Sequence, residues 1–270
     1  MTSLEVRERA EKIRSSFEAS QATGPLLMPA ERIARYFAPP EMTAYALEYA
    51  YHLLGDVTGK TVLEFGCGDG MNTVMLAKRG AKVIAFDISA ELVALAAKRV
   101  EANGCRGVEF VLASAHTLPL KDESVDVVFG MAILHHLDLE LASEQVRRVL
   151  KKGGRAIFKE PLRNSKLLAW VRQFFPRRPD VSPFERPLTD QELKTFGTPY
   201  IRRARTFQLP SSSIAGLLPV WSGKASEFCA QVERKLLQRF PSLGYYATVK
   251  VFEMVKDDSS TDVRQNDLKS

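Results

Sequence analysis

Residues Val62–Gly70 read VLEFGCGDG, an apolar run that passes into glycines at three alternating positions, Gly66, Gly68 and Gly70. Because glycine has no Cβ, a loop of this composition lets the backbone approach a ligand without a clash. The helical pattern that follows, MNTVMLAKRG, would place free N–H groups and the positive end of a helix dipole at the loop. The stretch therefore predicts a strand, a ligand-binding turn and a helix in succession.

Further apolar runs repeat this order along the chain. KVIAFD, VEFVLA, VDVVFGM and RAIFKEP are separated by helical patterns, of which SAELVALAAKRVEANG begins at the N-cap Ser89 and LELASEQVRRVL is stopped by Gly153 and Gly154. Strands that are apolar throughout and alternate with helices indicate a parallel sheet with both faces covered. We expect an α/β, Rossmann-like fold with its ligand at the carboxyl ends of the strands.

The chain divides into four parts. Residues 1–58 read as an N-terminal helical segment and residues 59–161 as the ligand-binding core. Residues 162–255 read as a substrate-side cap with two further strands, RRARTFQL and YYATVKVFEMV, and with a T-x-x-E capping box at Thr189 and Glu192. The polar residues 256–270 read as a disordered tail.

The spacing of the glycines argues against two common nucleotide sites. The dinucleotide fingerprint G-x-G-x-x-G fails, because its third glycine would fall on Met71 or, counted from Gly68, on Thr73. A P-loop needs its second glycine five residues after the first, and Met71 stands there as well. The spacing therefore disfavours an NAD-dependent oxidoreductase or an ATPase, although both would share the fold.

Two acids narrow the choice of ligand. Asp87 ends the second apolar run, where a carboxylate accepts hydrogen bonds from ribose hydroxyls. Glu64 precedes the glycines, and an acid there repels a pyrophosphate and attracts an ammonium group, provided that the strand turns it to the crevice. A ribose with a cationic, amino-acid-like end fits both acids, and S-adenosylmethionine has both. The alternative is a turn that binds no nucleotide.

The composition argues against several classes of partner. Of 270 residues, 45% are apolar and 26% are charged, and no apolar run reaches the roughly 18 residues of a membrane span. The net charge of +6 is read as a solvated basic surface, because no nucleic-acid-binding motif accompanies it. Three cysteines and four histidines lack metal-ligand spacing. We expect a cytoplasmic protein that binds a small molecule, without a metal or a nucleic-acid partner.

Four segments between residues 61 and 161 together resemble the class I S-adenosylmethionine-dependent methyltransferases. They are VLEFGCGDGMNT, VIAFDIS, LPLKDESVDVVFGMAILHHL and RVLKKGGRAIFKEP. The likeness is greatest to the methyltransferase type 11 branch, which includes quinone-biosynthesis C-methyltransferases. It implies a seven-stranded, mostly parallel sheet with one antiparallel strand, helices on both faces, and methyl transfer from S-adenosylmethionine.

Carried over by position, the resemblance implies a set of cofactor-binding residues. They are the loop residues Glu64, Gly66, Cys67 and Gly68, the ribose ligand Asp87 with its neighbour Ile88, the residues Ser114 and Ala115 beside the adenine, and Gly130 and Met131 beside the methionine moiety. Members often have an acid where Ser114 stands, to bind the adenine amine. The serine implies either weaker cofactor binding or a contact moved to a backbone group.

Three residues near strand ends are candidate catalytic groups: His135, His136 and Glu160. Alignment of the acceptor supplies about 7–11 kcal/mol in such reactions, and a general base adds about 10²- to 10⁴-fold. We expect at most one of the adjacent histidines to face the pocket, the other packing or making a structural hydrogen bond. Glu160 is expected either to meet the substrate or to form a surface salt bridge, and His116 to be a loop residue.

Substrate choice is expected to lie outside the core, and an apolar or aromatic acceptor is favoured. Residues 165–178 combine apolar and basic side chains, which is typical of a core-packed helix with a basic edge or of a peripheral membrane contact. In the second case a lipid or isoprenoid acceptor follows. A cofactor-binding module without catalysis is the other alternative. The sequence carries no signal for the oligomeric state or the acceptor atom.

Overall fold

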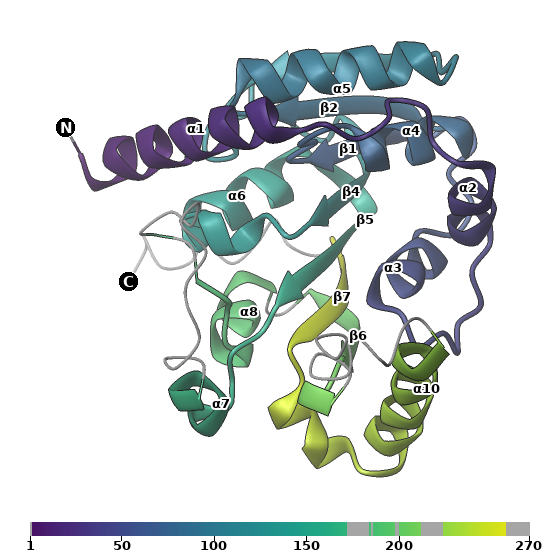
Figure 1. Ribbon diagram of the computed structural model, residues 1–270. Coiled ribbons are helices and arrows are strands. Elements are labelled where there is room, and N and C mark those ends of the chain that lie inside the picture. Colours follow the sequence, from purple (N-terminus) through teal and green to yellow (C-terminus); the bar gives the residue numbers. More distant parts are fainter. Residues whose placement is uncertain (1, 172–183, 185, 198–199, 212–223, 258–270) are drawn as a thin grey trace.

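The computed structural model describes residues 2–171, 184, 186–197, 200–211 and 224–257. Within them a seven-stranded sheet has the order β3-β2-β1-β4-β5-β7-β6, and helices lie on both of its faces (Figure 1). The strands are β1 (Thr61–Phe65), β2 (Lys82–Asp87), β3 (Val108–Leu112), β4 (Val125–Met131), β5 (Leu150–Pro161), β6 (Ile201–Phe207) and β7 (Val249–Val255). Only β7 runs antiparallel to its neighbours, β5 and β6. The predicted α/β, Rossmann-like fold is confirmed.

The helices follow the predicted pattern along the described chain. They are α1 (Ser3–Gln21), α2 (Ala30–Phe37), α3 (Ala46–Leu54), α4 (Met71–Lys78), α5 (Ala90–Ala102), α6 (Leu139–Val149), α7 (Lys166–Val171), α8 (Asp190–Gly197) and α10 (Lys224–Arg239), with 3₁₀ turns at Leu134–His136 and Pro241–Tyr246. The Ser89 hydroxyl accepts the Leu92 N–H at the start of α5. Thr189 and Glu192 form the expected capping box before α8.

Two boundaries differ from the prediction. Helix α6 ends at Val149, and the chain passes directly into β5, so Gly153 and Gly154 lie inside a strand and do not stop the helix. Strand β7 begins at Val249, because the preceding YY residues belong to a 3₁₀ turn. The predicted disordered tail lies, from residue 258 on, outside the described residues, as do residues 172–178 of the predicted membrane-contact segment.

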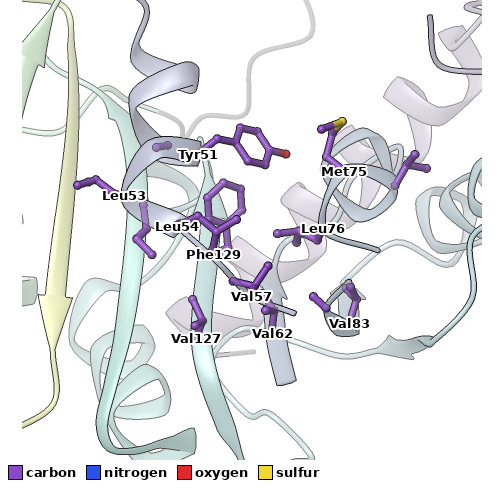
Figure 2. Close-up of a cluster of buried hydrophobic side chains, with 14 of the residues drawn as sticks. Tyr51, Leu53, Leu54, Val57, Val62, Met75, Leu76, Val83, Val127 and Phe129 are labelled. Carbon is purple, nitrogen blue, oxygen red and sulfur yellow. The ribbon is translucent and has the colours of Figure 1, made fainter. Parts of the chain in front are cut away.

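Side chains of β1 alternate between two hydrophobic clusters, one on each face of the sheet. Val62 packs in the cluster beneath α3 and α4, which Figure 2 shows with Tyr51, Met75 and Phe129. Leu63 and Phe65 pack in the cluster on the α6 and α8 side. Since both faces are buried, the register of β1 is fixed. The loop that follows β1 is therefore held at the edge of the sheet by the core.

The N-terminal helix α1 lies apart from both clusters. Its first turn is closed by a capping box between Thr2 and Glu5, and the helix packs against α5 (Figure 1). From there it crosses the sheet edge formed by the carboxyl ends of the parallel strands, where it reaches Leu137 after β4. In the part of the chain that the structure describes, no helix has the length and apolar character that crossing a bilayer requires.

Candidate cofactor site

A cavity of about 340 Å³ lies between α1 and the carboxyl ends of β1, β2, β3 and β4. This is where an open α/β sheet binds its ligand, because the strand order reverses between β1 and β4. Nine of its lining residues come from sequence-predicted positions: Gly66, Gly68, Asp87, Ile88, Ser114, Ala115, Met131, His135 and His136. The structure thus brings together, at one edge, residues that are spread over seventy positions of the chain.

The glycine loop owes its composition to two different causes. A Cβ on Gly70 would lie 2.7 Å from Ala96 Cα, so Gly70 is required by the packing of α4 on α5. Gly68 has a positive φ of 49°, yet a Cβ built on it would meet nothing within 4 Å. Because Gly68 lines the cavity, the open space beside it is space for a ligand.

Asp87 is fixed at the end of β2 by two backbone N–H groups. Its Oδ2 accepts the N–H of Gly68 at 3.0 Å and its Oδ1 accepts the N–H of Ser89 at 3.1 Å. Burial raises the pKa of this carboxyl, although these hydrogen bonds act in the opposite direction. Each carboxylate oxygen keeps a further lone pair, so Asp87 can accept two ligand hydroxyls without moving. The loop and the carboxylate form one groove, as the sequence predicted.

Glu64 and Cys67 do not line the cavity. Glu64 projects to the α4 side, where its Oε2 accepts the Thr73 hydroxyl at 2.5 Å and its buried Oε1 has no hydrogen-bond partner among the described residues. Burial raises the pKa of Glu64 to about 8. Cys67 is 4% exposed, and burial raises the pKa of its thiol. The strand alternation therefore turns Glu64 beneath the loop and not directly into the crevice.

At the end of β4, Met131 lines the cavity and Gly130 does not. A Cβ on Gly130 would lie 2.4 Å from Phe158 Cε1, so a packing requirement accounts for this glycine. The backbone then enters the 3₁₀ turn, whose position is set by Glu160. That carboxylate is fully buried, and its Oε1 accepts the N–H groups of Ile133 and Leu134, both at 2.9 Å.

Both histidines of the turn line the cavity, so the expectation that at most one would do so is wrong. Neighbouring side chains diverge on a strand, but in this 3₁₀ turn the two ring centroids lie 4.0 Å apart. His135 Nδ1 lies 2.9 Å from Glu160 Oε2. His136 Nδ1 lies 3.0 Å from Glu11 Oε2, without hydrogen-bond geometry. Glu160 therefore neither forms a surface salt bridge nor lines the cavity. It is buried behind His135 and contacts the Nδ1 of that ring.

Sequence reasoning missed the wall that α1 contributes. Six of its residues line the cavity: Arg7, Glu8, Glu11, Arg14, Ser15 and Glu18. Their spacing of three and four positions places them on one helix face, which is the one signal the sequence offered. His116, expected in a loop, does lie in one, but it is buried and also lines the cavity.

The comparisons with known proteins agree with this geometry. The family described as "Methyltransferase domain" matches residues 63–158, which run from β1 to β5. Residues 63–158 are thus identified as a methyltransferase domain of this family. The matched region includes the glycine loop, Asp87 and both histidines, and it leaves out α1.

Two relatives and one solved structure show how far the likeness to this methyltransferase domain extends. A malonyl-[acyl-carrier protein] O-methyltransferase from Hamiltonella defensa is 30% identical over 57% of this chain and 58% of its own length. A demethylmenaquinone methyltransferase from Thermobifida fusca is 35% identical over 38% of this chain and 44% of its own. The chain thus spans about half the length of these curated relatives.

The solved structure extends the likeness in fold beyond the methyltransferase domain. A geranyl diphosphate C-methyltransferase from Streptomyces coelicolor shares the fold, with a TM-score of 0.54 and 15% identity over 77% of this chain and 78% of that chain.

The residues present fit S-adenosylmethionine, the cofactor of this methyltransferase domain. Gly68 leaves an open cradle, and Asp87 offers free lone pairs to a ribose. The lining also favours a cation, since it carries four acids, Glu8, Glu11, Glu18 and Asp87, against two arginines. The described residues contain no cluster of three or more His, Cys, Asp or Glu that could hold a metal ion.

Proposed function

We propose that this protein is an S-adenosylmethionine-dependent methyltransferase that acts on a small, apolar or aromatic acceptor. The observation that carries the proposal is the single cavity that joins the open backbone of Gly68, the carboxylate of Asp87 and the 3₁₀ turn after β4. When bound, the cofactor supplies a methyl group made electrophilic by its sulfonium. Asp87 and the glycine loop hold it, and α1 excludes water from the cavity.

The 3₁₀ turn is the proposed catalytic edge of this cavity. Glu160 acts as a positioning residue, because it binds two backbone N–H groups and orients His135. His136 is the proposed general base, acting through Nε2. Its Nδ1 is buried and lies 3.0 Å from Glu11 Oε2, whose negative charge would stabilise the imidazolium that forms. Replacing His136 by Gln should therefore remove one limb of the pH–rate profile and leave cofactor affinity unchanged.

The acceptor class is inferred from relatives and from α7. The demethylmenaquinone and geranyl diphosphate methyltransferases are named for molecules that carry an apolar isoprenoid portion, whereas the third is named for malonyl-[acyl-carrier protein], which does not. In α7, which follows the carboxyl end of β5, Leu167 is 60% and Trp170 is 56% exposed, three residues apart on one helix face. These side chains support an apolar acceptor and, as a second candidate, one held in a membrane.

Two measurements test the proposal. Isothermal titration should show binding of S-adenosylmethionine and S-adenosylhomocysteine to the wild-type protein, and Asp87→Ala should abolish it at the same protein concentration. Cell extracts incubated with the protein and deuteromethyl-labelled cofactor should then yield a labelled product by mass spectrometry. Binding of NADH without binding of either S-adenosyl compound would overturn the proposal, and cofactor binding without any labelled product would favour a non-catalytic module.

The membrane-held acceptor has its own test. Anionic vesicles should co-sediment the protein in a salt-sensitive way, and Leu167→Ser should reduce the sedimented fraction. Phe228→Ser is the matched control, because Phe228 is 70% exposed on α10. Equal recovery in the supernatant with and without vesicles would remove this candidate.

A further inference from the structure

Two donors of the segment that follows β3 converge on one carboxylate oxygen of α1. The Ser114 hydroxyl donates to Glu8 Oε1 at 2.5 Å, and His116 Nδ1 lies 2.9 Å from the same oxygen. The other ring nitrogen of His116, Nε2, accepts the backbone N–H of Asp138 at 3.0 Å. The ring proton is therefore on Nδ1, from which His116 also donates to Glu8.

This arrangement holds an ionised carboxylate in the wall of the cavity. Burial works against the charge, but the hydrogen bonds from Ser114 and His116 lower the pKa of Glu8 below its usual value. The Glu8 side chain is 28% exposed, and its Oε2 takes no hydrogen bond from the described residues. One oxygen is thus fixed by the protein, and the second can accept a donor from a ligand.

The strand order tells which part of a bound nucleoside meets Glu8. Strand β3 neighbours β2 and lies on the side away from β4, and Ala113 N–H donates to the carbonyl of Asp87 at 3.1 Å. On the proposed function, a ribose bound to Asp87 and an amino-acid end directed to Gly68 and Met131 leave the base over Ser114. Of the acids that α1 contributes to the cavity lining, Glu8 is the one that is hydrogen-bonded to Ser114, so its carboxylate lies at the base position.

We propose that Glu8 is a cofactor-binding residue, whose carboxylate accepts a hydrogen bond from the exocyclic amine of the adenine. Ser114 and His116 are then positioning residues, because their hydrogen bonds orient the carboxylate. The inference rests on the proposed function and adds to it that α1 recognises the base. A carboxylate accepts only, so this site selects an amino-purine against a purine that carries an oxygen at the same position.

The test compares two ligands that differ at that one position, S-adenosylhomocysteine and S-inosylhomocysteine, by isothermal titration. Wild-type protein should prefer the adenosyl compound by about 10- to 100-fold, the range expected for a hydrogen bond to a charged group. Glu8→Gln should bring the two affinities within about threefold of each other, because the amide donates to the oxygen of the inosyl compound. Glu5→Gln is the matched control on the same helix, since Gln also serves in its capping box.

The possible outcomes separate this inference from the proposed function. If Glu8 only ties α1 to the loop, Glu8→Gln should lower the affinity for both ligands by the same factor. The ratio of the two affinities would then be unchanged, and this result would overturn the inference but not the proposed function. Ser114→Ala, which removes one of the two positioning donors, should lower the ratio to an intermediate value. Wild-type protein that binds neither compound would overturn the proposed function, and the inference with it.

Discussion

The two walls of the cavity are built by different physics. The strand wall is formed by Gly66, Gly68, Asp87 and Ser114. It stands on β1 and β2, whose side chains are mostly buried, and on β3, most of whose apolar side chains pack partly buried against the two hydrophobic clusters. The helix wall is the face of α1 that lines the cavity, and polar contacts such as Arg7 to the Leu137 carbonyl hold it. Burial of apolar area stabilises far more than single exposed hydrogen bonds do. A substitution that disrupts the packing beneath the strand wall should therefore lower the free energy of unfolding most. A substitution that only fills the cavity or loosens α1 should change it little.

Gly70→Val tests the packing that supports the strand wall, because Gly70 ends the loop that carries Gly66 and Gly68 and packs on Ala96. The new side chain would clash with the Ala96 backbone, 2.7 Å from the Cβ, and would be strained at a φ of +83°. We expect the free energy of unfolding to fall by about 3–5 kcal/mol in urea denaturation. Gly104→Val is the matched control, with a positive φ but nothing within 4 Å. An equal decrease in the free energy of unfolding in the two variants would show that the contact with Ala96 does not contribute to the effect of Gly70→Val.

Glu64, which lies beneath the loop, should make the free energy of unfolding depend on pH. Its pKa rises from 4.5 to about 8 through burial, so the folded protein keeps a proton that the unfolded chain has lost. The free energy of unfolding should then decrease as pH rises between these values, by at most about 1.4 kcal/mol per pH unit.

Urea unfolding at pH 5, 6.5 and 8 measures this slope. Glu64→Gln should be flatter over the range, because Gln does not titrate and can still accept the Thr73 hydroxyl. Parallel curves for the two proteins would show that Glu64 is ionised in the folded state.

Gly68→Val separates binding from folding within the same loop. Its side chain would enter the open space of the cavity, so affinity for S-adenosylhomocysteine should fall by about 100-fold, equivalent to about 2.7 kcal/mol. The free energy of unfolding should fall by only about 1–2 kcal/mol, the cost of a positive φ. Retained affinity would mean that the ligand does not approach this backbone.

The smallest expected effect concerns the helix wall. Arg7→Met removes the 2.7 Å hydrogen bond to the Leu137 carbonyl and keeps an apolar stem. The free energy of unfolding should change by about 1 kcal/mol or less, while hydrogen exchange in α1 rises and exchange in β1 and β4 stays unchanged. Faster exchange in the strands would show that the helix wall supports the core after all.

The same contrast explains what the sequence could reveal. Continuous apolar runs, helical patterns and the glycines with Asp87 are local signals, and they predicted every parallel strand and the groove between Gly68 and Asp87. The role of α1 rests on contacts between residues more than a hundred positions apart, such as Glu8 with Ser114. No local pattern encodes such a pair.

The orientation of Glu64 and the pairing of His135 with His136 could not be predicted from the sequence for other reasons. The alternation of side chains along β1 predicts that Glu64 and Val62 lie on the same face of the sheet. Which helices cover that face follows from the packing of the whole domain, and in the structure α4 covers it. The pairing of His135 and His136 depends on the 3₁₀ turn, which Glu160 imposes from another strand. The expectation that adjacent side chains point in opposite directions holds for a strand and does not apply to a 3₁₀ turn.

The buried thiol of Cys67 makes the loop after β1 report on its own motion. At 4% exposure and with its pKa raised, it should react with a maleimide only when the loop opens, whereas Cys105 and Cys229 are partly accessible. The alkylation rate of Cys67 would therefore measure how often the loop opens. The decrease of this rate as ligand is added would give the affinity of the protein for that ligand without an enzymatic assay.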